Sequence, residues 1–401
     1  MSSSYAALSQ FERDLHVKRK IAVVTTSRAD YGHLFWPLRE LAAHPEVQLE
    51  LIAMGAHLSP EFGATIREIE KDGFAISAKL ECLLSSDSDV GMAKTIGLAT
   101  LSLADTLAAL RPDILLLIAD RFEILAPASV ALALRIPIAH IEGGEFSEGA
   151  IDDAVRHALT KMSHIHFTST EAARRRIIAM DEEEWRVHRA GAPSLDHLRR
   201  SALPSRAELQ LRLGITLRNP AIVIAYHPVT IARNTVQEAD ALFAALEAIT
   251  GQLLFCYPNA DAGSRELIER TRAFVARRED SHVFVNLDRV TYWGLLRQAD
   301  LFLGNSSSGI METPSLALPA VNIGLRQQGR ERAKNILDAS PHATAILAAV
   351  EQARSAAFRN SISGMINPYG EGRAAEKIVE VLTTVPLTLE LLMKRHRPEP
   401  L

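Results

Sequence analysis

Cysteine is scarce in this sequence of 401 residues, which contains only Cys82 and Cys256. The two stand far apart and outside any Cys-x-x-Cys spacing, which argues against a zinc cluster and is typical of a reducing cytoplasm. Neither sign of charge dominates: 44 Lys and Arg face 48 Asp and Glu, giving a net charge of -4. The sequence therefore offers no general electrostatic reason to bind nucleic acid or an anionic membrane, and any anion site must be local.

Long apolar runs are missing as well. Residues 1–19 mix Ser, Glu, Arg, Asp and Lys and lack the apolar stretch of a signal peptide. The apolar run at 124–134 is interrupted by Pro127, and no run reaches the roughly 18 residues that span a bilayer. We therefore expect a soluble, cytoplasmic protein with no membrane partner.

Short β-branched apolar runs alternate with longer amphipathic stretches, which predicts parallel strands joined by crossover helices, an α/β fold. Most predicted strands are apolar on both faces, as a sheet buried between two helix layers requires. Strands are predicted at 21–26, 48–54, 114–118, 137–141, 165–169, 186–190, 221–226, 252–257, 282–286, 301–303 and 320–323. Helices are predicted at 31–43, 62–72, 92–110, 152–162, 170–180, 206–213, 235–249, 264–278, 292–298, 309–316 and 372–382.

A polar stretch at 196–219 interrupts the alternation, and we place a domain boundary there. The predicted parts are an N-terminal extension at 1–19, a Rossmann-like domain at 20–203, a second at 204–384, and a tail at 385–401. The last helix could cross back onto the first domain. Ligands of open α/β sheets lie beyond the carboxyl ends of the strands, so two doubly wound domains facing each other would enclose a site.

One turn rich in glycine and serine is typical of a phosphate site. It follows the predicted strand at 301–303 and reads Gly304-Asn305-Ser306-Ser307-Ser308-Gly309. Its small residues let the backbone approach an anion, and its hydroxyls and the following helix start add donors. A serine-capped helix without a ligand is the alternative.

Two further side chains after this turn extend the interpretation. Glu312 can accept both hydroxyls of a ribose, as acids do in dinucleotide folds. Arg326 can supply a forked cation to a diphosphate, whereas Arg330 is interpreted as a surface charge. Together with the serine turn, these residues predict a nucleoside diphosphate site.

Arg28 lies in the turn after the first predicted strand. The turn lacks Gly-x-Gly-x-x-Gly, so a nicotinamide or flavin loses its main support and we expect no cofactor. We predict that Arg28 makes a second contact to the diphosphate. A salt bridge to Asp30 or to a neighbouring loop is the alternative.

Three carboxylates and one histidine stand at the ends of predicted buried elements. Asp120 and Glu142 follow two strands, Asp152 begins a helix, and His227 ends the first strand of the second domain. Converging carboxylates in a closed cleft can hold shifted pKa values suited to proton transfer, and His227 could move a proton or contact a phosphate. The alternatives are a plain N-cap for Asp152 and a buried histidine with satisfied hydrogen bonds for His227.

A metal site is a weaker hypothesis. His140 shares a strand face with Glu142, and His164 shares one with His166. The sequence contains no compact set of His, Cys and Asp ligands, so we expect no bound metal.

Several motifs together resemble one known family, the hydrolysing UDP-N-acetylglucosamine 2-epimerases of sialic acid and nonulosonate synthesis. The resemblance extends from about Lys20 to Leu382. The motifs are Ser27-Arg28-Ala29-Asp30-Tyr31-Gly32, Asp120-Arg121-Phe122-Glu123, His140-Ile141-Glu142-Gly143-Gly144-Glu145, Ile151-Asp152-Asp153-Ala154-Val155-Arg156-His157-Ala158, His227-Pro228-Val229-Thr230, the serine turn, and Asn367-Pro368-Tyr369-Gly370.

The resemblance implies a two-domain glycosyltransferase-B fold, no metal and no nicotinamide, and a homo-oligomer, either a dimer or a tetramer. It implies catalytic positions at Asp120, Glu142, Asp152 and His227. It implies nucleotide-binding positions at Arg28, Ser306, Ser307, Ser308, Gly309, Glu312 and Arg326. The family usually has Gly where Ala119 stands, so a methyl group could crowd the sugar or alter the turn. No kinase-like extension follows Leu401, so we do not expect the bifunctional animal form.

The resemblance also implies a reaction. UDP-N-acetylglucosamine loses UDP by elimination, a 2-acetamidoglucal stays in the cleft, and water adds with the opposite configuration at C2 to give N-acetylmannosamine. The same reaction on UDP-2,4-diacetamido-2,4,6-trideoxyglucose, on the way to legionaminic acid, is the nearest alternative. A glycosyltransferase of the same fold and a non-catalytic sensor of nucleotide sugars are further alternatives.

Overall fold

The computed structural model describes residues 18–395, apart from 85, 87, 149, 233, 235, 237, 258–262 and 286. Most of the expected extension at 1–19 and the last six residues of the expected tail at 385–401 lie outside these residues. So do residue 235, where a helix was expected to begin, and residue 286, where a strand was expected to end.

Two parallel sheets form the framework. The first contains β1 (Arg19–Thr25), β2 (Val47–Met54), β3 (Ile76–Leu80), β4 (Ile114–Ile118), β5 (Ile138–Ile141), β6 (Ile165–Thr168) and β7 (Val187–Arg189). The second contains β8 (Ala221–Ala225), β9 (Gln252–Cys256), β10 (Ser281–Phe284), β11 (Leu301–Gly304), β12 (Ala320–Ile323) and β13 (Ile336–Ala339). Their strand orders are β3-β2-β1-β4-β5-β6-β7 and β10-β9-β8-β11-β12-β13. The predicted pair of doubly wound sheets is confirmed.

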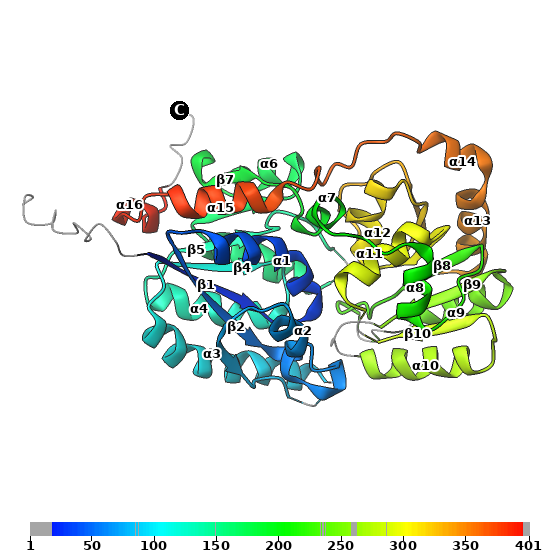
Figure 1. Ribbon diagram of the computed structural model, residues 1–401, viewed down its shortest axis with the longest axis horizontal. Helices are drawn as coiled ribbons and strands as arrows, with labels where there is room; N and C mark the ends of the chain where they lie inside the picture. The colour runs from blue at the N-terminus through cyan, green and yellow to red at the C-terminus, as the bar shows by residue number, and fades with distance from the viewer. Residues whose placement is uncertain are drawn as a thin grey trace, which may run out of the picture.

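Helices cover both faces of each sheet (Figure 1). Those in the first half of the chain are α1 (Arg28–Ala43), α2 (Ile66–Lys71), α3 (Asp89–Leu110), α4 (Leu125–Ala133), α5 (Asp152–Met162), α6 (Glu171–Ala179), α7 (Asp196–Arg200) and α8 (Arg206–Leu213). Those in the second half are α9 (Ala239–Ala248), α10 (Ser264–Ala276), α11 (Arg289–Gln298), α12 (Ser308–Met311), α13 (Ala343–Arg354), α14 (Ala356–Ser361), α15 (Ala374–Thr384) and α16 (Leu389–Leu392).

The alternation of side chains along the central strands explains the layers. In β1, Ile21 and Val23 join the core under α1, whereas Ala22 and Val24 join the core under α3 and α4. Successive side chains of a strand point to opposite faces, so a strand that is apolar throughout must be covered on both sides. The second sheet is built in the same way, with separate cores on its two faces.

Seven helices and strands were missing from the sequence prediction: β3, β13, α4, α7, α13, α14 and α16. The strands β3 and β13 are the edges of their sheets and are largely half-buried or exposed, so they lack the continuous apolar runs of the central strands. In α4, Pro127 lies in the first turn, where a missing N–H breaks no helical hydrogen bond. The run at 124–134 is therefore a helix and not an interrupted stretch.

The end of the chain returns to the first sheet, as the sequence suggested. Helix α15 packs against α1, and Ala374, Ile378 and Leu382 belong to the core shared with β1 and β4. Figure 1 shows α15 in red above the half of the molecule that contains β1 and β4. The N-terminal part is thus closed by the C-terminal helix, while the boundaries expected at 203 and 384 stay predictions.

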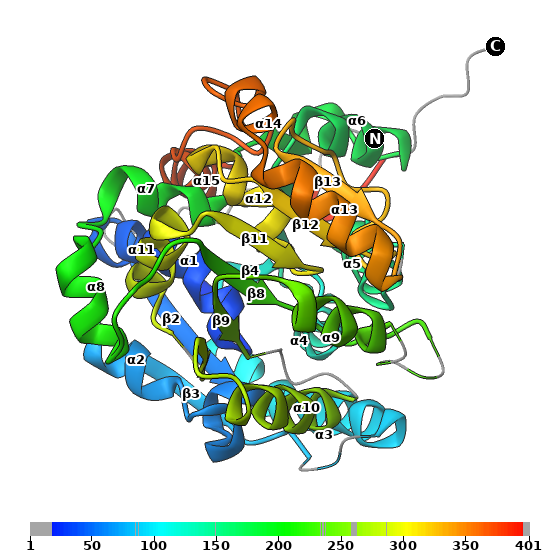
Figure 2. The same cartoon turned by 90° about the vertical axis from the view of Figure 1, so that its right-hand side faces the viewer.

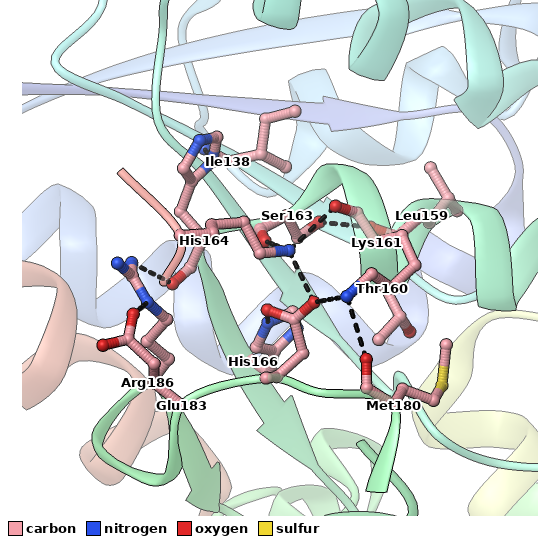
Figure 3. A network of polar contacts seen from close by, with 12 residues as sticks. Ile138, Leu159, Thr160, Lys161, Ser163, His164, His166, Met180, Glu183 and Arg186 are labelled. Atoms are coloured by element: carbon pink, nitrogen blue, oxygen red, sulfur yellow. Dashed lines mark hydrogen bonds and ion pairs between the residues drawn. The ribbon is translucent and has the colours of Figure 1, made fainter. Parts of the chain in front are cut away.

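A buried ionic network fastens the segment after α15 (Figure 3). The Glu182 carboxylate accepts hydrogen bonds from Lys161 Nζ at 2.7 Å and His166 Nε2 at 3.3 Å, and Lys394 Nζ lies 2.6 Å from it. The fully buried Arg186 donates to the carbonyls of Glu390, Leu391 and Met393 around α16. The C-terminal segment is thereby held at the β6–β7 edge of the first sheet.

Helix α3 is long and apolar enough, by length and composition alone, to cross a membrane, which the sequence analysis did not expect. Helices in the cores of soluble proteins meet the same criterion. Here Ala99, Leu103 and Leu107 pack into the core of the first sheet.

Candidate active site

The candidate site lies between the two sheets, where each strand order reverses. In the first sheet this point is between β1 and β4, and in the second it is between β8 and β11. Figure 2 shows β8 and β11 side by side, with α1 of the first part behind them. Crevices at such switch points are where open α/β sheets bind ligands. Of the predicted site residues, those that line one cavity here are Arg28, Asp120, Glu142, Asp152, His227, Ser306, Ser307, Ser308, Glu312 and Arg326.

Gly309 is the predicted site residue that does not line this cavity. It is buried within α12, and a Cβ atom added to it would meet the ring of Phe302 at 2.6 Å. Its N–H donates to Ser306 O at 3.1 Å. Gly309 therefore packs against Phe302 and stabilises the serine turn through its backbone N–H, on the side away from the cavity.

The turn after β1 is shaped by Asp30 and presents Arg28. The Asp30 carboxylate accepts hydrogen bonds from the N–H and hydroxyl groups of Thr26 and Ser27, at 2.5 to 3.1 Å. The guanidinium of Arg28 reaches across the cleft and donates to Leu287 O at 3.2 Å. Asp30 thus builds the turn, and of the two alternative partners of Arg28 the structure shows a contact with a loop, at Leu287, rather than with Asp30.

Asp120 and Asp152 approach the cavity from β4 and α5. Asp120 forms an ion pair with Arg156, whose side chain is buried and also donates to Glu145 O at 3.0 Å. Helix α5 begins at Asp152, and the N-cap residue of this helix is Ile151. The alternative of Asp152 as a plain N-cap is therefore wrong.

Glu142 sits where β5 ends, in an unusual backbone conformation. Its φ is 64°, in the left-handed region, and its N–H still donates to Phe167 O at 2.8 Å. The carboxylate is nearly buried and accepts a hydrogen bond from His33 Nδ1 at 2.8 Å. Burial would raise the pKa of Glu142, but the charge and hydrogen bond of His33, together with Arg330, lower it below its ordinary value. Glu142 is therefore an ionised carboxylate that is nearly buried at the wall of the cavity.

The serine turn depends on a close approach of β8 and β11. Gly304 has a φ of 149°, and a Cβ atom added to it would lie 2.0 Å from Ala225 O. Next to it, the Asn305 amide exchanges two hydrogen bonds with the backbone of His227, at 2.7 and 2.9 Å. These contacts fix Ser306 and His227 at adjacent strand ends.

The expected helix at 309–316 is split in two. Helix α12 ends at Met311, and a 3-10 turn, η7 (Thr313–Leu316), follows with Pro314 near its start. Proline lacks the N–H that would continue the helix. Glu312 lies at the break, lines the cavity, and accepts a hydrogen bond from the Ser308 hydroxyl.

Cations surround the serine turn. Arg326 Nη1 donates to Asn305 O at 3.3 Å, and Arg330, which was interpreted as a surface charge, lines the cavity and donates to Phe146 O at 3.0 Å. Burial and the cations Arg326, Arg28 and Arg121 lower the pKa of His227 well below its ordinary value. At neutral pH His227 is therefore an uncharged imidazole among positive charges.

The histidines of the weaker metal hypothesis make structural hydrogen bonds. His140 Nε2 pairs with Ala119 O at 2.7 Å, His164 Nδ1 accepts from Ile138 N at 3.1 Å, and His166 contacts Glu182. Within the residues that the structure describes, no group of three or more His, Cys, Asp or Glu side chains could hold a metal ion.

Sequence reasoning missed three side chains of the site: His33, Arg156 and Arg289. His33 and Arg289 line the cavity, and Arg156 pairs with Asp120. Arg156 stood inside a quoted motif, so its position was visible although its role was not. His33 and Arg289 lie within helices, and nothing in the sequence shows which helix faces turn toward the cleft.

Comparison with known proteins identifies the family. The family model described as UDP-N-acetylglucosamine 2-epimerase matches residues 39–383. The chain belongs to this family. The resemblance predicted from the motifs is thereby confirmed.

Two similar relatives bear a more specific name. The GDP/UDP-N,N'-diacetylbacillosamine 2-epimerase (hydrolyzing) of Campylobacter jejuni is 38% identical over 80% of this chain and 84% of its own length. The UDP-N,N'-diacetylbacillosamine 2-epimerase (hydrolyzing) of Legionella pneumophila is 34% identical over 94% of this chain and 98% of its own length. The UDP-N-acetylglucosamine 2-epimerase of Neisseria meningitidis is 32% identical over 84% of this chain and 88% of its own length.

Solved structures agree on the fold. The UDP-GlcNAc 2-epimerase from Neisseria meningitidis bound to UDP-GlcNAc matches with a TM-score of 0.76 at 17% identity, covering 90% of this chain and 99% of that one. The enzyme from Methanocaldococcus jannaschii in complex with UDP-GlcNAc and UDP gives the same TM-score at 17% identity, covering 91% and 99%. The expected two-domain glycosyltransferase-B architecture is confirmed.

Proposed function

We propose that this protein is a hydrolysing 2-epimerase that converts a UDP-2-acetamido sugar and water into UDP and the free 2-epimeric sugar. One observation carries the proposal: acidic side chains from the first sheet and the serine turn with Arg326 from the second line the same cavity. The family and the names of the relatives support the same reaction.

The chemistry explains why acids and an anion site are needed together. The proton on C2 of the sugar is very weakly acidic, so a carboxylate can remove it only if the bond from C1 to UDP breaks in the same process. A 2-acetamidoglucal results, and water then adds a hydroxyl to C1 and a proton to C2 from the other face. Acid and base must therefore be held on defined faces of the ring.

We assign the proton transfers jointly to Asp120, Glu142 and Asp152, with His227 beside the leaving group. In this assignment Arg28, Arg326 and the hydroxyls of the serine turn bind the diphosphate, and Glu312 binds the ribose. The positive charges around the turn support the assignment, because negative charge grows on UDP as it leaves and fixed cations stabilise it.

Variants of the acids test the assignment. Asp120→Asn and Glu142→Gln should each lower kcat for UDP release by about a hundredfold or more, as expected for loss of an acid–base group. Both should still bind UDP in calorimetry, because neither acid is among the proposed nucleotide contacts, most of which come from the other sheet. Asp105→Asn, on the exposed side of α3, is the matched control. Full turnover in Asp120→Asn would refute the catalytic assignment.

The sugar is a separate question. The motifs placed UDP-N-acetylglucosamine first, but the relatives at 38% and 34% identity are named for N,N'-diacetylbacillosamine. These identities favour the diacetamido sugar, and with it a role in nonulosonate synthesis. Incubation with each UDP-sugar at equal concentration, followed by UDP release, decides the matter: a larger kcat/KM for UDP-N-acetylglucosamine would overturn this preference.

We further propose a cytoplasmic homo-oligomer. Five large apolar side chains are exposed on the neighbouring helices α3 and α4 and at the end of α4: Val90, Leu98, Leu101, Leu132 and Leu134. Such a face is costly to leave in water and supports self-association. Light scattering after chromatography should show a dimer or tetramer that Leu101→Lys weakens. A monomer at micromolar concentration would refute this proposal.

A further inference from the structure

His33 connects carboxylates that belong to the two sides of the cleft. It lies in the second turn of α1, where its Nδ1 is 2.8 Å from Glu142 Oε1 and its Nε2 is 3.8 Å from Glu312 Oε1. Glu142 ends β5 of the first sheet, whereas Glu312 follows α12 of the second. One imidazole ring therefore stands between an acid proposed to act on the sugar and an acid proposed to bind the ribose.

This geometry requires a charged ring. An ionised carboxylate can only accept hydrogen bonds, so two carboxylates facing the two ring nitrogens are best satisfied when both nitrogens carry protons. The side chains of Glu142 and Glu312 are 8% and 7% exposed, so water does little to stabilise their charges. Without a cation beside it, burial would favour the protonated form of Glu142.

Three carboxylates and a second imidazole act on the charge of His33. Asp30 on α1, Glu142 after β5 and Glu312 after α12 favour its protonation. His197, at the start of α7, also couples to it, and burial keeps that imidazole neutral by lowering its pKa to about 4. Burial also opposes the charge on His33, but the three carboxylates outweigh it and raise its pKa to about 9. Arg330 and His140 act on Glu142 in the same direction as His33.

We propose that His33 is a positioning residue of the reaction: as an imidazolium it keeps Glu142 ionised, ready to take the C2 proton, and holds it in line with Glu312. This proposal rests on the proposed function, because it gives Glu142 the part of the base. It requires no group beyond those in the chain. The proton that His33 carries stays on His33 throughout, and the C2 proton goes to Glu142 as the C1–O bond to UDP breaks.

The pH profile of kcat/KM tests the proposal, because it reports the pKa values of essential groups in the free enzyme. In His33→Gln a hydrogen-bond donor remains but the charge is lost, so the acid limb should move up by about one pH unit or more. Activity lost at the pH of the wild-type acid limb should return at higher pH. His33→Lys should restore the position of the acid limb, because it restores the cation. His342→Gln, an exposed histidine, is the control and should leave the profile unchanged.

An unmoved acid limb in His33→Gln would overturn the proposal, however much kcat falls, because a merely structural role lowers activity without shifting a pKa. Loss of the fold in a variant would not decide the question, so a second measurement uses the intact protein. NMR titration of the His33 ring should give a pKa near 9 in the wild type and a value about two units or more lower in Glu142→Gln.

The same titration distinguishes a failure of the proposed function from a failure of the role assigned to His33. If the wild type releases no UDP from any UDP-sugar but His33 still titrates near 9, the proposed function fails and the pairing stands. If the enzyme is active but His33 titrates in the ordinary range, the assignment of His33 is wrong and the function stands.

Discussion

At two strand ends of the site, residues other than glycine adopt left-handed backbone. Ala119 has a φ of 59° and Glu142 a φ of 64°, and both line the cavity. Such a conformation costs roughly 1–2 kcal/mol for a residue with a Cβ atom. Strain of this kind gathers at functional sites, where the surrounding structure holds it in place. It also agrees with the resemblance described from the sequence, which implies glycine at the position of Ala119.

Ala119→Gly should therefore raise the free energy of unfolding by about 1 kcal/mol, because glycine adopts this backbone without strain. Urea denaturation measures it. The matched control is Ala108→Gly on the exposed side of α3, which should lower stability by about 1 kcal/mol because it is in an ordinary helix. If both variants lost stability equally, the left-handed conformation of Ala119 would not be the source of strain.

Single residues of the site could be predicted when their position followed from the strand pattern. Asp120 and Glu142 end neighbouring strands of a parallel sheet, so they must lie at one edge. His33 could not be predicted, because its role depends on which face of α1 meets the second domain. Arg330 was misinterpreted for the same reason. It contacts a loop of the other domain at Phe146, and the sequence does not show which loop of the first domain will face it.

At the scale of elements, the carboxyl end of β11 controls the nucleotide side of the cavity. Gly304 lets β11 pass Ala225 so closely that any side chain would collide with its carbonyl. The three serines begin two residues later, after Asn305, so a displacement of Gly304 would also displace the proposed diphosphate site. The serine hydroxyls can reach the cavity because this single backbone position has no side chain.

Gly304→Ala should lower the free energy of unfolding by about 2 kcal/mol or more and weaken UDP binding at least about tenfold. Thermal unfolding and calorimetry with UDP measure the two effects. Gly97→Ala is the matched control: it lies in α3 with nothing within 4 Å of the added Cβ atom, and should stabilise the helix by roughly 0.5–1 kcal/mol. Unchanged UDP affinity in Gly304→Ala would show that the turn tolerates displacement.

The sequence predicted the central elements well and the outer ones poorly. The run Ile114–Ile118 is buried throughout and could be recognised as a strand from its apolar residues alone. Edge strand β3, Ile76–Leu80, alternates between half-buried and exposed positions. It has no continuous apolar run and was therefore not predicted as a strand. The single helix expected at 309–316 was wrong because Pro314 falls in its second half, where its missing N–H interrupts the helix.

At the scale of the molecule, ion pairs span the cleft and hold the two parts together. Arg289 makes a bidentate pair with Asp72 at 2.7 and 3.0 Å, and Arg265 makes one with Glu61 at 2.6 and 2.9 Å. Two-point pairs of this kind fix orientation as well as distance. The structure is therefore in a closed arrangement, in which the proposed acids and the serine turn face the same cavity.

The C-terminal segment depends on Glu182, and this gives a pH prediction. Burial would raise the pKa of Glu182, but His166, Lys161 and Lys394 lower it to about 2. A lowered carboxyl pKa stabilises the fold above its unfolded value of about 4.5, and this stability is lost as the pH falls toward 2. Glu182→Gln should therefore cost about 3 kcal/mol at pH 7 and clearly less at about pH 3.

Urea denaturation at the two pH values measures this difference. Glu171→Gln is the control, because its carboxylate is 38% exposed and an exposed ion pair contributes under about 1 kcal/mol. A cost for Glu182→Gln that is the same at both pH values would contradict the assigned charge state.

The most direct test of the proposed function is to follow the C2 hydrogen. The protein is incubated in deuterated water with UDP-N,N'-diacetylbacillosamine or UDP-N-acetylglucosamine, and the products are examined by NMR. Elimination and hydration predict UDP together with a free sugar that has the opposite configuration at C2 and carries deuterium there. A sugar released or transferred with its original hydrogen and configuration at C2 would contradict the proposal.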